Sequence, residues 1–66
     1  MEIRTKDKQI AWTLAEMIKA QARAQGVQER PVSLDPSRKV VYLSQTVPRE
    51  LIDRVTAGFN RIKVVY

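Results

Sequence analysis

Hydrophobic and polar positions along this chain follow two different periods. Between residues 7 and 25 the apolar residues recur every three or four positions, which is the spacing of a helix with one buried side. Asp7 is a suitable N-cap and Gly26 a natural C-terminal stop, so we predict a helix between them, followed by a polar connection over 27–30. The side of this helix expected to face the interior carries Ile10, Ala11, Leu14, Ala15, Met17, Ile18 and Ala22.

The tetrapeptide Lys-Val-Val-Tyr occurs twice, at 39–42 and at 63–66, in segments with the composition of strands. Between the copies, helical spacing predicts a second helix with Pro48 in its first turn, capped by Thr46 or Val47. A strand, helix and strand in succession place both strands parallel in one sheet, with the helix on one face. The apolar side of this helix and its left-handed exit are assigned to Leu51, Ile52, Val55 and Phe59, and to Gly58 and Asn60, respectively.

Two further strands are short. Residues 31–34 alternate, and Pro31 cannot donate to a ladder, so we predict an edge strand there. The sequence Asp-Pro-Ser-Arg at 35–38 is typical of a type I turn that reverses the chain into the next strand. We expect residues 2–5 to form a short first strand with Ile3 pointing inward.

These elements predict one α+β domain over residues 1–66, a small two-layer sandwich with the order strand, helix, strand, strand, helix, strand. This order is that of the ferredoxin-like sandwich (βαββαβ), in which the first and third strands are central. If residues 2–5 are not a strand, the fallback is αββαβ with a three-stranded sheet. The order also resembles RNA-recognition motifs, but the segment 38–43 lacks the glycine and paired aromatics that stack RNA in that family, so the resemblance implies the fold alone.

Composition limits the partners that we expect. Twelve Lys and Arg against 7 Asp and Glu give a net charge of +5, which draws polyanions and favours nucleic acid as a partner. A chain of this length buries a thin core, and it has no cysteine or histidine for a disulfide or a structural zinc site, so we expect a homo-oligomer. With no long apolar run and no secretory start, we expect a cytoplasmic protein without a membrane partner.

Catalytic chemistry has little support in the sequence. There is no histidine, no Gly-rich phosphate loop, and no nucleophile at a recognisable spacing from a base. The carboxylates are scattered and form no evident pair. We therefore expect no enzyme, no cofactor, no metal and no small-molecule substrate.

A sheet with both helices on one side leaves its other side bare. If Val40, Tyr42 and Val64 face the helices, the bare side displays an apolar strip that would serve as an oligomer interface. The opposite phase instead displays Tyr42 and Tyr66 outward, as platforms on which bases could stack. The predicted interface strip consists of Val41, Leu43 and Val65.

A second candidate surface lies on the first helix. Trp12 falls about 200° around the helix from Ile10, among cations, where its ring could stack on a base while the cations hold phosphates. Alternatively, Trp12 covers the aliphatic stems of its neighbours, lies at the edge of the core, or packs on another subunit. The residues predicted to bind nucleic acid are Lys8, Trp12, Lys19, Arg23, Arg38, Lys39 and Lys63.

The function predicted from these observations is that of a small basic binding module, not an enzyme. It self-associates and binds nucleic acid, DNA or RNA, with little sequence preference. The alternative is a structural or adaptor protein that acts through protein–protein contacts and has no nucleic-acid role.

Overall fold

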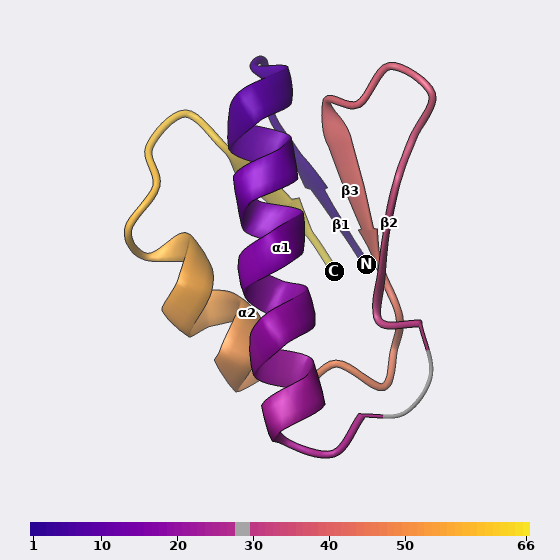
Figure 1. Cartoon of the computed structure of the whole chain (residues 1–66). Coiled ribbons are helices and arrows are strands. Elements are labelled where there is room, and N and C mark those ends of the chain that lie inside the picture. The colour runs from indigo at the N-terminus through magenta and orange to yellow at the C-terminus, as the bar shows by residue number, and fades with distance from the viewer. Residues whose placement is uncertain (28–29) are drawn as a thin grey trace.

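The computed structural model describes residues 1–27 and 30–66. In the chain order of Figure 1 its elements are β1 Glu2–Arg4, α1 Lys8–Ala24, β2 Val32–Leu34, β3 Val40–Leu43, α2 Arg49–Thr56 and β4 Lys63–Val65. A small α+β protein is therefore confirmed, and the short segment that begins at Glu2 is a strand. Of the predicted polar connection, residues 28 and 29 lie outside the described residues.

The four strands form one antiparallel sheet in the order β2-β3-β1-β4. Ile3 of β1 lies opposite Val41 of β3 on one side and Val64 of β4 on the other. Because β3 and β4 are both antiparallel to β1, they run in the same direction, as predicted for the two Val-Val strands, with β1 inserted between them. The predicted edge strand after Pro31 is also confirmed, since β2 pairs only with β3 among the described strands.

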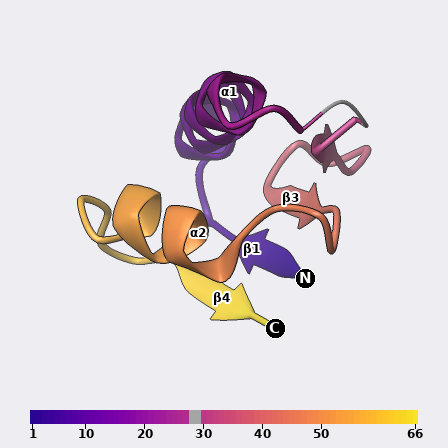
Figure 2. The ribbon, with the colours of Figure 1, turned by 90° about the horizontal axis from the view of Figure 1, so that it is seen from below.

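Both helices cover the same face of this sheet (Figure 2). The core between the two layers consists of Ile3, Ala11, Leu14, Ala15, Ile18, Ala22, Val41, Leu43, Val47, Leu51, Ile52 and Val55. Small alanines on α1 let its backbone approach the sheet closely. Met17, predicted to face the core, is instead 38% exposed, because it lies at the rim of the buried arc of α1.

The ends of α1 follow the prediction. The Asp7 carboxylate accepts a hydrogen bond of 2.8 Å from the Gln9 backbone N–H, and Gly26 has a φ of 87°. Gly tolerates this left-handed conformation because it has no Cβ. Among the described residues, no helix has both the length and the apolar character required to cross a lipid bilayer.

The ends of α2 differ from the prediction. Pro48 is the N-cap residue rather than part of the first turn, and the Thr46 hydroxyl lies 2.8 Å from the Ser44 hydroxyl instead of capping the helix. The left-handed residue after α2 is Arg61, with a φ of 61°, and not Gly58 or Asn60. Residues 57 and 58 continue the turn of the helix, so the reversal falls directly before β4.

The predicted phase of β3 was wrong. Val41 and Leu43 are 0% and 6% exposed and belong to the core, so they cannot form an interface strip on the bare face. The pairing sets this phase, because residues directly opposite across a ladder point to the same face and Val41 lies opposite the buried Ile3. Tyr42 is accordingly the residue on the bare face, 47% exposed.

On β4 the predicted phase was correct. Val64 lies opposite Ile3 and packs against the core, while Val65 lies opposite Glu2 on the bare face. Tyr66 returns to the helix side, where its hydroxyl donates to the Asp53 carboxylate and the Arg49 guanidinium lies 3.9 Å from its ring centroid. Val65 is thus the one member of the predicted strip that the bare face retains.

Candidate nucleic-acid interface

One end of the sheet gathers lysines and arginines from four segments of the chain. Because β3 and β4 run opposite to β1, both strands begin where β1 ends, and α1 also begins there (the upper end in Figure 1). We call this end the basic pole. It comprises Arg4, Lys6, Lys8, Arg38, Lys39, Arg61 and Lys63.

The basic pole accounts for most of the net charge of the chain. Its seven cations are accompanied by three acids, Asp7, Asp35 and the Glu2 that pairs with Arg4, which leaves +4. The remaining five cations and four acids of the chain leave +1. The charge is therefore concentrated at one end, and such asymmetry produces a directed positive potential.

Two of the acids at the pole, Asp7 and Asp35, are held by backbone groups. Asp7 caps α1, and the Asp35 carboxylate accepts hydrogen bonds from the Ser37 hydroxyl at 2.7 Å and from the Lys39 and Val40 N–H groups at 3.2 and 3.1 Å. The Ser37 hydrogen bond, helped by those of the backbone, lowers the pKa of Asp35 below its ordinary value. Asp35 thus stays ionised and fixes the turn from which Arg38 and Lys39 extend.

Thr5 connects three of the segments that build the pole. Its N–H donates to the Lys39 carbonyl at 2.9 Å, and its hydroxyl lies 2.8 Å from that carbonyl and 2.9 Å from the Asp7 carbonyl. Thr5 is buried, with 8% of its surface exposed. The end of β1, the start of β3 and the start of α1 are therefore held in fixed relation.

Two hollows lie between the cations of the pole. One, of 490 Å³, is lined by Arg4, Thr5, Lys6, Arg61, Ile62 and Lys63. The other, of 330 Å³, is lined by Lys8, Gln9, Trp12, Leu34 and Arg38. Trp12 is 57% exposed, away from the core as predicted, and it lines the same hollow as Lys8 and Arg38.

The structure brings together part of the predicted site. Lys8, Arg38, Lys39 and Lys63 lie in the basic pole with Trp12 beside it. Lys19 and Arg23 lie further along α1, in a separate groove against β2.

The predicted site did not include Arg4, Lys6 and Arg61. Each lies within four residues of a predicted cation, but the three basic segments are far apart in sequence, and only the sheet order shows that they share one end. Within the described residues, Arg4 is the one pole cation with an ion-pair partner, the Glu2 carboxylate at 3.3 Å, and its hydrogen bond to Glu2 raises the pKa of Arg4.

The described part of the chain contains no evident metal site. No group of three or more His, Cys, Asp or Glu residues there is arranged to hold a metal ion. Comparisons with protein family models, curated proteins and solved structures found no match to this chain. Its function has to be inferred from the geometry and charge of the surface.

Proposed function

We propose that this protein is a non-enzymatic module that binds nucleic acid through the basic pole, with little sequence preference. The observation that carries the proposal is the concentration of a net charge of +4, out of the +5 of the chain, at one end of the sheet. Lysines and arginines neutralise phosphates and release their counterions, which supplies affinity without reading the base sequence.

The position of Trp12 supports a preference for single strands. A duplex hides the faces of its bases, whereas a single strand can stack a base on an exposed aromatic ring, which contributes about 1–3 kcal/mol per base. Lys8 and Arg38 border the same hollow as Trp12 and are suitably placed for the adjoining phosphates. Trp12 is also the only tryptophan of the chain, so its fluorescence reports on this surface alone.

The test is the salt dependence of binding to a labelled single-stranded oligonucleotide, with DNA, RNA and duplex compared. For four to seven phosphate contacts, the slope of log affinity against log salt should be about −3 to −5, since each contact on a single strand contributes about 0.7. Base stacking should quench Trp12 fluorescence, and heparin, a polyanion without bases, should not quench it in the same way.

A matched pair of charge reversals locates the site. Arg61→Glu at the pole should weaken binding and reduce the salt slope on a single strand by about 0.7, as expected for loss of one phosphate contact. Arg54→Glu changes the net charge equally from an exposed position on α2, outside the pole, and should leave the slope unchanged. Equal effects of both variants would refute the assignment to the pole, and no binding at low salt would refute the nucleic-acid proposal in favour of the adaptor role.

Self-association is the second part of the proposal. The bare face of the sheet carries Tyr42 and Val65, with the Glu2–Arg4 ion pair between the strands that hold them. A second copy of the chain could cover these side chains. The same face would serve other proteins if the adaptor role were correct.

We also propose that the arrangement is the ferredoxin-like one. Supporting this are two strand, helix, strand halves and a sheet in which β1 and β3 are the inner strands. Nuclear Overhauser contacts from β1 to both β3 and β4 in solution would test it, and contacts to only one of them would contradict it.

A further inference from the structure

The outer edge of β2 offers hydrogen-bonding groups that the sheet does not use. The Ser44 N–H donates to the Pro31 carbonyl, and the Asp35 N–H donates to the Val40 carbonyl, at 2.9 and 3.1 Å. In an antiparallel pair, residues that bond across the ladder alternate with residues that do not. The N–H and C=O groups of Val32 and Leu34 therefore point away from β3, toward the free edge.

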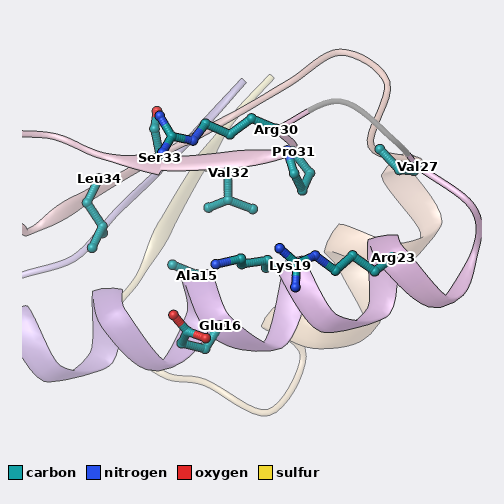
Figure 3. Close-up of a pocket in the computed structure, with 10 residues that line it drawn as sticks. All are labelled: Ala15, Glu16, Lys19, Arg23, Val27, Arg30, Pro31, Val32, Ser33 and Leu34. Carbon is teal, nitrogen blue, oxygen red and sulfur yellow. The ribbon is translucent and has the colours of Figure 1, made fainter.

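A groove runs along this edge, between β2 and α1. It has a volume of 620 Å³, and its lining includes the apolar residues Ala15, Val27, Pro31, Val32 and Leu34. Figure 3 shows α1 and β2 as its two walls, with the Val32 and Leu34 side chains pointing toward the helix. An edge strand beside a groove is the arrangement to which an extended peptide adds as a further strand.

The charge of the groove selects the kind of peptide. Among the residues that the structure describes, its lining contains three cations, Lys19, Arg23 and Arg30, and one acid, Glu16. In Figure 3 Lys19 and Arg23 extend along the helix wall, while Arg30 extends toward Ser33 on the side of β2 away from the helix. Acidic side chains of an added strand that point into the groove would therefore meet Lys19 and Arg23.

A second copy of this chain fits the edge poorly. Pairing two β2 edges would bring the Lys19, Arg23 and Arg30 side chains of both copies toward one another, and like charges in such proximity are unfavourable. Charge complementarity therefore favours an acidic partner over a copy of the same protein.

We infer that the groove between α1 and β2 binds an extended acidic peptide segment, which adds to β2 as an antiparallel strand. Its residues opposite Val32 and Leu34 form the ladder hydrogen bonds, and their side chains face the groove because directly opposed residues share a face. These are the positions for glutamate or aspartate. The inference does not depend on the basic pole or on binding of nucleic acid there.

The experiment uses a capped heptapeptide of alternating glutamate and valine, with the isotope-labelled protein observed by NMR. We expect the peptide to shift the Val32 and Leu34 amide signals, and the corresponding lysine–valine peptide to leave them in place. N-methylation of the glutamates should abolish binding, because it removes the N–H groups that face β2. N-methylation of the valines should not, since their N–H groups point away.

Charge variants make a second arm. Lys19→Glu combined with Arg23→Glu should lower the affinity for the glutamate peptide by roughly tenfold, given that exposed charge pairs are each worth up to about fivefold. Lys6→Glu combined with Arg61→Glu, which changes the net charge equally at the basic pole, should leave it unchanged. If the groove variant failed to fold, the two methylated peptides would still decide the question on the unmodified protein.

Four results in the absence of nucleic acid would overturn the inference. These are equal binding of the two methylated peptides, equal binding of the lysine peptide, peptide-induced shifts confined to the pole, and concentration-dependent shifts of Val32 and Leu34 without peptide, which would indicate a second copy. An oligonucleotide that shifted the same two amides would overturn it as well, because the groove would then belong to a nucleic-acid surface.

Discussion

At the scale of single residues, Arg61 combines an unfavourable backbone conformation with a useful charge. Its φ of 61° is left-handed, which costs a residue with a Cβ about 1–2 kcal/mol. Arg38 has the same conformation, with a φ of 60°, at the turn before β3. Both arginines precede a strand that begins at the basic pole. Glycine would be less strained at these positions but would remove the positive charge, so the residue that favours binding is not the one that favours stability.

Substitution of Arg61 should separate these two demands. Arg61→Gly removes the strain, but it also raises the conformational entropy of the unfolded chain, which costs about 0.5–1 kcal/mol of stability. We therefore expect a net gain in unfolding free energy of roughly 0.5–1 kcal/mol. Arg61→Ala retains the Cβ and should bring no such gain. Both variants should bind oligonucleotides more weakly than the natural chain. Urea unfolding and oligonucleotide titration measure the two properties, and a Gly variant less stable than the Ala variant would contradict the argument.

Tyr66 provides a pH-dependent contact. Its hydrogen bond to Asp53 raises the pKa of the phenol above its ordinary value of 10.0, and partial burial adds to the shift. A raised pKa in the folded state means that the contact stabilises the fold fully below pH 10 and is lost as the pH rises through the higher folded value. In an ultraviolet titration Tyr66 should therefore ionise above 10, and Asp53→Ala should return it toward 10. An unchanged titration in that variant would show that Asp53 is not the cause.

At the scale of elements, Thr5 should contribute more to the unfolding free energy than its position outside the helices and strands suggests. Thr5→Val keeps the shape of the side chain but removes the hydroxyl between the Lys39 and Asp7 carbonyls. Loss of a buried hydrogen bond of this kind costs about 1–3 kcal/mol in unfolding free energy. Thr13→Val, on α1 and only partly buried, is the matched control with a smaller expected effect. Equal losses in both variants would remove the special role assigned to Thr5.

Whether the sequence predicted the inward and outward positions of a strand depended on whether the strand carries a charged residue. On β4 the exposed Lys63 fixed the phase, so the inward position of Val64 followed from the sequence. On β3 the run Val40-Val41-Tyr42-Leu43 is apolar in both phases, and alternation alone could not choose between them. Pairing of Val41 with Ile3 made the choice, and this contact spans 38 positions of the chain.

In the candidate site, too, the features set by local sequence were predicted and those set by long-range pairing were not. Trp12 could be placed outside the core because helical periodicity is local, and its exposure agrees with that prediction. The basic pole depends on which strands share an end, so its cations from residues 4–8, 38–39 and 61–63 are not neighbours in any local pattern. The strand directions that follow from the predicted order of elements would have placed these cations at one end of the sheet. The sequence prediction did not take that step.

At the scale of the whole molecule, the bare face of the sheet limits how strongly two copies can associate. Four strands about 4.8 Å apart and three or four residues long cover roughly 14 by 10–13 Å, far less than the ~800 Å² per partner of a standard interface. A dimer formed there should be weak and should appear only toward millimolar concentration.

Sedimentation over a range of concentrations should reveal this weak dimer. Tyr42→Glu places a charge in the centre of the bare face and should leave a monomer, while Met17→Glu, an equal change at an exposed apolar residue on α1, should not. Two copies on one long oligonucleotide would raise each other's local concentration, so binding should be cooperative on long strands and not on short ones. Tyr42→Glu should abolish that cooperativity and leave the affinity for short strands intact. A clean monomer at millimolar concentration, or cooperativity that survives Tyr42→Glu, would exclude the bare face as the site of self-association.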